Sequence, residues 1–353
     1  MPSAATIGWD IGGAHLKAAR LGDGASVEQV EQLPCPLWQG LDHLRHALDE
    51  ALSRLGPAAH HAITMSGEMV DLFRNRGEGV QRLVEVLDGR LAGSGRLHFY
   101  AGEQGFVDSR AAVADPARIA SANWHASAAL VAARLPAALL LDIGSTSTDV
   151  AVIAGGRVQA RGRSDAERLI DEELVYTGAV RTPLMALADR APFGGAWIPL
   201  MAEHFATAAD VHRLTGQLPA QADQHPAADG HEKTAAGSAR RLARMIGHDA
   251  EDAEPADWRR LARWFAQRQE ERIAGACERA LSRGLLDDRA PLVGAGIGRF
   301  MAAQIARRLE RPYRDFASLV TSAPDPSEWI AACAPAVAVA CLLGNEETAH
   351  VDR

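Results

Sequence analysis

The sequence has very little lysine. Of its 37 basic residues, 35 are arginine, and only Lys17 and Lys233 are lysine. In a chain so biased towards Ala and Arg, a surviving lysine is a candidate for a task that needs a compact, mobile ammonium rather than a planar guanidinium. We predict such a task for Lys17, which stands beside a glycine turn. For Lys233 a binding role and chance survival on the surface stay open.

Cysteine, long apolar runs and positive charge are scarce as well. The four cysteines (Cys35, Cys277, Cys333 and Cys341) make no metal-binding spacing and read as reduced thiols of a cytoplasmic protein. No run is long and apolar enough to span a membrane, and the N-terminus lacks a basic, then apolar leader. The net charge of −8 argues against a nucleic-acid partner. At 353 residues, two domains are expected.

One turn motif occurs twice in the sequence. Residues 6–17 read TIGWDIGGAHLK and residues 139–150 read LLLDIGSTSTDV. In each copy a short apolar strand ends on Asp (Asp10 or Asp142), then Ile-Gly and small residues lead into another strand. Small residues let the backbone approach a ligand, successive N–H groups bind anions, and Asp can hold a divalent cation such as Mg²⁺. Two copies predict two like domains that face one phosphate-bearing ligand.

A third stretch, PLVGAGIGRF at residues 291–300, predicts a strand, a glycine turn and a helix start. It lies too late in the chain, and lacks the following βαβ unit, to be a dinucleotide fingerprint. A strand followed by a helix N-terminus is still an anion site. Together the three stretches resemble the actin, sugar kinase and Hsp70 superfamily. The resemblance implies an α/β fold of two ribonuclease-H-like domains, residues 1–135 and 136–353, with a cleft between them that usually holds ATP.

The spacing of apolar residues predicts strands at 6–10, 16–20 and 27–33, and helices at 41–55, 79–91, 257–283 and 300–309. We also expect a helix at 184–190, an irregular insertion at about 191–235 that acts as a substrate-binding flap, and a last helix at 335–343 on the second sheet. Glu68 is expected in the first turn of a helix, where it either complements the helix dipole or serves as a base or metal ligand. Asn123 is an N-cap candidate. Trp124 and His125 mark either a site or a core anchor.

Five stretches resemble one family more closely: GGAHLK at 12–17, SGE at 66–68, ANWHA at 122–126, DIGSTSTD at 142–149, and ELVYTG at 173–178 with RTP at 181–183. The chain is similar to the hydantoinase/oxoprolinase-like family linked to tetrahydromethanopterin-dependent one-carbon transfer. The resemblance implies a transferase that joins an aminomethylfuran-methyl diphosphate to the phenol of a tyramine- or tyrosine-derived acceptor and releases pyrophosphate. The Ala- and Arg-rich composition suits a bacterium of high GC content, for which the product is methylofuran.

The chemistry gives the candidate residues their roles. A lysine, backbone N–H groups and Mg²⁺ stabilise a leaving diphosphate, a base activates the phenol, and an aromatic ring stacks on the substrate. The catalytic candidates are Lys17, Glu68, His125 and Asp149. The binding candidates are Gly12, Gly13, His15, Asn123, Trp124, Gly144, Ser145, Thr146, Tyr176, Arg181, Lys233, Gly294 and Gly296. The metal candidates are Asp10 and Asp142.

Two other functions compete with this one. An ATP-dependent small-molecule kinase or hydantoinase/oxoprolinase-type ATPase would use the same turns, although Ala14-His15 stands where sugar kinases usually have Ser or Thr, which puts ATP binding in doubt. A sugar-kinase-like repressor ranks last, because no helix-turn-helix precedes the first turn and the net charge is negative. The expected partners are small-molecule substrates, with no nucleic acid and no membrane, and a homo-oligomer is left open.

Overall fold

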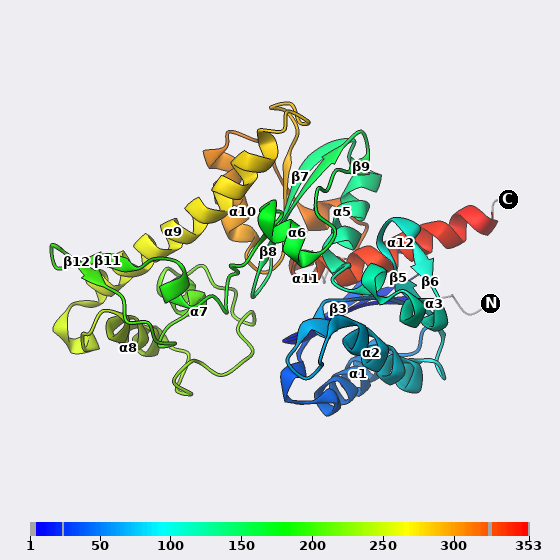
Figure 1. Cartoon of the computed structure of the whole chain (residues 1–353), viewed down its shortest axis with the longest axis horizontal. Coiled ribbons are helices and arrows are strands. Elements are labelled where there is room, and N and C mark those ends of the chain that lie inside the picture. The colour runs from blue at the N-terminus through cyan, green and yellow to red at the C-terminus, as the bar shows by residue number, and fades with distance from the viewer. Residues whose placement is uncertain (1–4, 23–24, 324–326, 352–353) are drawn as a thin grey trace. The chain divides into compact units, whose positions relative to one another are not determined.

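The computed structural model describes residues 5–22, 25–323 and 327–351. The chain forms two compact units, one of residues 1–138, 153–159 and 315–353 and the other of residues 139–152 and 160–314. Each unit contains one main β-sheet with helices packed around it (Figure 1). The single cut between residues 135 and 136 stays a prediction about domains, whereas the compact units are discontinuous because the chain returns to the first unit at residue 315.

The first sheet has the strand order β3-β2-β1-β4-β5-β6. Strand β2 runs antiparallel to β1, and β4 and β5 run parallel to it. The strands are β1 (Thr6–Ile11), β2 (His15–Leu21), β3 (Val27–Pro34), β4 (His60–Met65), β5 (Arg96–Tyr100) and β6 (Phe106–Val107). The three strands expected at the start of the chain are therefore confirmed.

The second sheet repeats this order, as β10-β8-β7-β13-β14, with the short β9 paired to β8. Strand β13 is parallel to β7, as β4 is to β1, and β10 is antiparallel to β8, as β3 is to β2. The strands are β7 (Ala137–Ile143), β8 (Thr148–Ala154), β9 (Arg157–Val158), β10 (Leu174–Val175), β13 (Leu292–Ala295) and β14 (Tyr313–Asp315). The duplicated turn thus joins the first two strands of two sheets with the same plan.

The two faces of β1 meet different helices. Ile7, Trp9 and Ile11 belong to a core shared with the apolar faces of α1 (Leu41–Leu55) and α2 (Arg76–Leu91). Gly8 faces the opposite way, where a Cβ would lie 2.0 Å from the carbonyl oxygen of Ala336. That carbonyl belongs to α12 (Ala334–Val351), which contacts β1, β2, β4 and α5 (Asn123–Arg134). The expectation that the last helix packs on the second sheet is wrong, because Gly8 admits it to the first.

Replacing Gly8 by alanine should destabilise the protein by roughly 1–3 kcal/mol, because a backbone carbonyl cannot move aside as a flexible side chain can. Gly89 in α2 is the matched control, since a Cβ there meets nothing within 4 Å. Gly89→Ala should stabilise the helix by about 0.5–1 kcal/mol. Urea denaturation of both variants checks the pair. Equal midpoints for Gly8→Ala and the wild type would contradict the close approach of α12.

The remaining helices agree with the sequence in part. Helices α9 (Pro255–Leu281) and α10 (Arg299–Arg308) match the expected ones closely. The helix expected at 184–190 is instead a 3-10 turn, Leu184–Ala186, followed by strand β11 (Arg190–Phe193). Shorter helices are α3 (Ser109–Ala114), α4 (Pro116–Ile119), α6 (Asp165–Ile170) and α11 (Ser327–Ala332), and further 3-10 turns are Leu37–Gln39, Gly67–Met69, Gly102–Gln104, Ala250–Asp252 and Phe316–Leu319.

Residues 191–235 are less irregular than expected. They include most of a β-hairpin, β11 with β12 (Ala196–Pro199), and helix α7 (Ala208–Leu214). With α8 (Ala235–Met245) and α9 these elements enclose a core that contains Val211, Leu242 and Trp258. The first half of the segment is therefore a packed part of the second unit, whereas residues 215–234 form no helix or strand, and the role of a substrate-binding flap stays a prediction.

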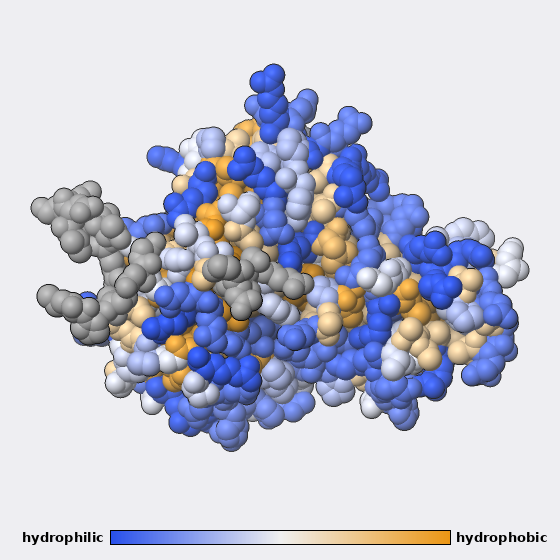
Figure 2. Space-filling model, turned by 180° about the vertical axis from the view of Figure 1, so that it is seen from behind, coloured by the Kyte–Doolittle hydropathy of each residue, from blue (hydrophilic) through white to orange (hydrophobic). Residues whose placement is uncertain are grey.

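Apolar side chains do not gather on the visible surface. The face in Figure 2 is covered mainly by hydrophilic residues, with small, scattered hydrophobic areas. In the part of the chain that the structure describes, no helix combines the length and the apolarity needed to cross a bilayer.

Candidate functional site

The first glycine turn is stabilised by a backbone hydrogen bond, and an ion pair lies beside it. Gly12 N–H donates to the His15 carbonyl at 3.0 Å, and a Cβ on Gly13 would lie 2.9 Å from Val70 Cγ1. Asp10 and Lys17 are register partners on β1 and β2, and Lys17 Nζ lies 3.6 Å from Asp10 Oδ2. The turn therefore carries a carboxylate and an ammonium side by side, with both side chains mostly buried.

Glu68 lies directly against this turn. It sits on the 3-10 turn Gly67–Met69, not in the first turn of a helix as expected, because α2 begins only at Arg76. A Cβ on Gly67 would lie 3.1 Å from the Gly12 carbonyl carbon. Glu68 is 1% exposed, and Ser121 Oγ donates to its Oε1 at 2.8 Å. Glu68 also packs against the first turn of α2, since a Cβ on Gly79 would lie 2.8 Å from Glu68 Cβ. Both readings, a base or metal ligand and a complement to the helix dipole, stay predictions.

Ser121 is a residue that the sequence analysis missed. Its φ is +52°, in the left-handed region that non-glycine residues rarely adopt. Such strain concentrates at functional sites. Here the conformation accompanies the hydrogen bond to Glu68. The sequence offers no signal for it, since serine is ordinary before a helix.

Trp124 and His125 begin helix α5 together. His125 Nδ1 and the Tyr100 hydroxyl share a hydrogen bond of 2.8 Å, and the rings of Trp124 and His125 meet edge to face at 5.4 Å. Burial, with smaller contributions from nearby carboxylates, raises the pKa of Tyr100. Trp124 is 6% exposed, so little of it is open to a substrate. Asn123 is the first helical residue rather than the N-cap, which is Ala122.

The second glycine turn is built from three segments of the second unit. Gly144 N–H donates to the Ser147 carbonyl at 2.9 Å, and the hydroxyls of Ser145 and Thr146 lie 3.4 Å apart. The late turn between β13 and α10 packs on it, since a Cβ on Gly296, where φ is +79°, would lie 2.6 Å from Asp142 Oδ1. The structure thus brings Asp142 and the late glycine turn together.

The third segment is the loop Tyr176–Thr182. The N–H groups of Ala179 and Arg181 donate to the carbonyls of Gly144 and Ser145 at 2.9 and 2.8 Å. Gly178 lies so close that a Cβ would be 2.5 Å from Thr146 N. Between the exposed side chains of Tyr176 and Arg181, the loop is buried. We call the turn Asp142–Thr148 with this loop and the late glycine turn the cradle.

A family model described as hydantoinase/oxoprolinase matches residues 60–338. The chain belongs to the hydantoinase/oxoprolinase family.

Two curated relatives carry the same name, "(4-{4-[2-(gamma-L-glutamylamino)ethyl]phenoxymethyl}furan-2-yl)methanamine synthase". The one from Methanocaldococcus jannaschii is 28% identical over 247 residues, which cover 69% of this chain and 72% of the relative. The one from Methanococcus vannielii is 35% identical over 80 residues, which cover 23% of this chain and 36% of the relative. These matches support a biosynthetic transferase role.

Two solved structures are similar to the chain, and the one with a TM-score above 0.5 bears on the fold. Nucleotide-free acetone carboxylase has a TM-score of 0.55 at 10% identity, covering 96% of this chain and 70% of that one. A ROK family glucokinase from Streptomyces griseus, solved with glucose and AMPPNP, has a TM-score of 0.47 at 14% identity, covering 96% and 98%. The fold is α/β, with two ribonuclease-H-like units of the actin, sugar kinase and Hsp70 type, as the sequence predicted.

Three candidate site residues of this hydantoinase/oxoprolinase family member contact groups that favour a structural role for them. Asp149 forms an ion pair with the buried Arg168 at 2.8 Å. Lys233 Nζ donates to the carbonyls of Asp223 and His225, both at 2.7 Å, and so ties down a surface loop. Gly294 leaves room for Tyr313, whose hydroxyl would lie 2.6 Å from a Cβ there. Their roles in catalysis or binding stay predictions.

A metal ion would find few protein ligands in this family member. Within residues 5–22, 25–323 and 327–351, no group of three or more His, Cys, Asp or Glu is placed to hold one. Mg²⁺ is usually bound through one or two carboxylates, waters and substrate phosphates rather than by a protein cage. Asp142, whose carboxylate lies against the late glycine turn, fits that kind of site. Asp10 fits it less well, because Lys17 already neutralises it.

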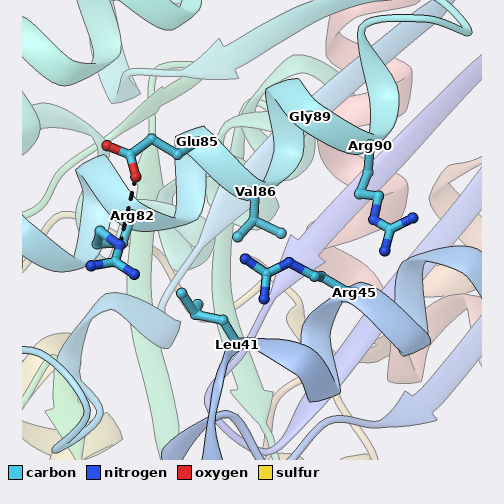
Figure 3. A pocket seen from close by; sticks show the side chains of 7 residues that line it. All are labelled: Leu41, Arg45, Arg82, Glu85, Val86, Gly89 and Arg90. Carbon is cyan, nitrogen blue, oxygen red and sulfur yellow. Dashed lines mark ion pairs between the residues drawn. The ribbon is translucent and has the colours of Figure 1, made fainter.

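A hollow of about 270 Å³ between α1 and α2 lies on the first unit (Figure 3). Arg45, Arg82 and Arg90 line it above an apolar floor that includes Val86. Each arginine forms an ion pair with a nearby carboxylate: Arg45 with Asp42, Arg82 with Glu85 and Arg90 with Asp49. The pair of Arg82 with Glu85, at 3.6 Å, is drawn in Figure 3. The hollow includes no residue of the glycine turns, and its charges are already balanced.

Proposed function

We propose that this protein is a transferase in the biosynthesis of a methanofuran-type cofactor. In a bacterium this cofactor is methylofuran. It condenses an aminomethylfuran-methyl diphosphate with the phenol of a tyramine- or tyrosine-derived acceptor. The observation that carries the proposal is the 28% identity to the synthase of Methanocaldococcus jannaschii. The printed name of that relative describes a phenoxymethyl furan, which is a furfuryl carbon bonded to a phenol oxygen.

The reaction forms one bond and breaks one. The phenol oxygen bonds to the furfuryl carbon, the bond from that carbon to the diphosphate oxygen breaks with its electron pair, and pyrophosphate leaves. The phenol proton passes to a base. A free phenol has a pKa of about 10, so a carboxylate or imidazole at hydrogen-bond distance helps the attack. The furan oxygen delocalises positive charge on the carbon.

The residues of each unit suit one half of this chemistry. In the second unit, the hydroxyls of Ser145 and Thr146 and the guanidinium of Arg181 are donors for diphosphate oxygens. In the first unit, Glu68 and His125 are the candidate bases, positioned by Ser121 and Tyr100. Lys17 supplies a mobile positive charge. Mg²⁺, held by Asp142 and the diphosphate, would neutralise charge on the leaving group.

The test uses purified protein with Mg²⁺, the aminomethylfuran-methyl diphosphate and tyramine or γ-glutamyl-tyramine, with and without ATP. Mass spectrometry follows the aryl ether, and a coupled assay follows pyrophosphate. We expect ether and pyrophosphate in equal amounts without ATP. Consumption of ATP with no ether would overturn the proposal in favour of a small-molecule kinase or a hydantoinase/oxoprolinase-type ATPase.

A further inference from the structure

The fully buried side-chain amide of Gln269 is hydrogen-bonded to the cradle loop, Tyr176–Thr182. Gln269, in the middle of α9, donates through Nε2 to Thr177 Oγ1 and to the Gly178 carbonyl, both at 2.8 Å. A primary amide has two N–H groups, so both are used. On its other side the same loop is bonded to the turn at Gly144 and Ser145. The N–H groups of Ala208 and Ala209 in α7 donate to the Thr182 and Val180 carbonyls of the loop at 2.9 and 3.1 Å. The loop is therefore fixed by the turn, by α7 and by Gln269.

The orientation of this amide follows from its partners. The Gly178 carbonyl can only accept, so the nitrogen of Gln269 must face it and the oxygen must face His212 Nε2, which lies 2.8 Å away. That nitrogen of His212 therefore donates. Burial lowers the pKa of His212 to about 4, so the ring is neutral at pH 7. The His212 ring also packs edge to face against the ring of Phe300 in α10, with the ring centroids 5.0 Å apart.

Two threonines continue the chain of donors into the loop. Thr182 Oγ1 accepts from Gly178 N–H at 2.8 Å and donates to the Gly178 carbonyl at 3.1 Å. Its hydroxyl proton is thereby used, so in the 3.1 Å contact between the two hydroxyls Thr177 is the donor. The order of donation runs from His212 through Gln269 and Thr177 to Thr182. Leaving one such buried group without a partner costs about 1–3 kcal/mol, which ties the loop to one position.

We propose that Gln269 is a positioning residue of the cradle: by fixing the loop Tyr176–Thr182 against the Gly144–Thr146 turn, it sets where Arg181 and the turn meet a diphosphate. The inference rests on the proposed function only in assigning a diphosphate to the cradle. Gln269 touches no substrate and acts through Thr177 and Gly178. A leucine of similar size would fill the same space but would leave His212, Thr177 and the Gly178 carbonyl each without one hydrogen-bond partner.

The experiment compares Gln269→Leu with Leu242→Ala. Leu242 is equally buried in the same unit and belongs to the α7–α8–α9 core, which contains no residue of the loop Tyr176–Thr182. Calorimetry measures the binding of Mg-pyrophosphate, and hydrogen–deuterium exchange follows the peptide spanning residues 174–184. We expect Gln269→Leu to weaken pyrophosphate binding at least tenfold and to raise exchange in that peptide. Leu242→Ala should lower the melting temperature but leave affinity within about twofold, because it touches no cradle residue.

Each other outcome counts against the inference. Unchanged affinity in folded Gln269→Leu, with wild-type binding intact, overturns the positioning role alone. An equal loss of affinity in Leu242→Ala shows general destabilisation and does the same. No pyrophosphate binding by the wild type overturns the proposed function as well. Should Gln269→Leu fail to fold, Thr182→Val, which removes the hydroxyl bonded to both polar groups of Gly178, provides the same comparison.

Discussion

Replacing Lys17 by methionine should slow ether formation by about 100- to 1000-fold, the usual loss when one preorganised donor to a developing negative charge is removed. Lys17 lies on β2 opposite Asp10, with its ammonium 3.6 Å from that carboxylate and 19% of its side chain exposed. The charge is thus held beside the glycine turn in a site that excludes most water. Single-turnover kinetics with saturating substrates measure the change at the chemical step.

Two further variants separate charge from shape. Lys17→Arg keeps the charge, but its planar guanidinium is larger and less mobile, so we expect an intermediate rate. Arg20→Met is the control: Arg20 lies on the same strand and loses an ion pair to Glu28 and bonds to two carbonyls, but it is not part of the turn. Its rate should stay within about threefold of the wild type. A similar rate in Lys17→Met would remove Lys17 from the catalytic group.

Lowering the pH from 7 to 4.5 should destabilise the fold by several kcal/mol. Burial, with smaller effects of His60 and His98, lowers the pKa of His61 to about 4, and burial lowers the pKa of His212 to about 4. Their ordinary value is about 6.5, so between pH 6.5 and 4 the unfolded chain binds protons that the folded chain refuses. Stability is full above pH 6.5 and falls as the pH drops, by up to about 1.4 kcal/mol per pH unit for each group.

His61 has a specific reason to stay neutral. Its Nδ1 accepts a hydrogen bond from Trp9 Nε1 at 3.1 Å, which a protonated nitrogen cannot do. Urea denaturation at several pH values measures the slope in the wild type and in His61→Gln. The variant should be less stable at pH 7.5 but should lose less on acidification. His46→Asn, on the exposed face of α1, should leave the slope as it is. Parallel slopes in wild type and His61→Gln would contradict this assignment.

Local patterns predicted most of the elements and the glycine turns. The alternation in β1 and the leucine spacing in α1 reflect which side chains the core must bury, and both signals are local. The doubling of the Asp-Ile-Gly turn predicted two like sheets, and their strand orders agree. The meeting of Asp142 with the late glycine turn was not predicted; it results from the parallel pairing of β7 and β13, which places the carboxyl ends of both strands together.

What the sequence did not reveal depends on contacts between distant segments. Helical spacing places Gln269 on the apolar face of α9, four residues from Phe265 and from Ile273, whereas the glutamine at position 267 is exposed. Which groups Gln269 bonds to depends on where α7 and the cradle loop pack, and the sequence does not reveal that. The helix expected at 184–190 failed because Arg190–Phe193 finds a strand partner in Ala196–Pro199. The place of the last helix was missed because its apolar residues suit either sheet, and only Gly8 on β1 decides between them.

The docking of α12 on β1 has a consequence for how the protein is made. One face of the first sheet is closed by α12, which is synthesised long after β1. At roughly 5–20 residues per second, that face of the sheet stays uncovered for tens of seconds. During synthesis the nascent first unit is therefore an incomplete sheet that chaperones can bind, and refolding of the full chain should be slow because its decisive contacts join distant positions.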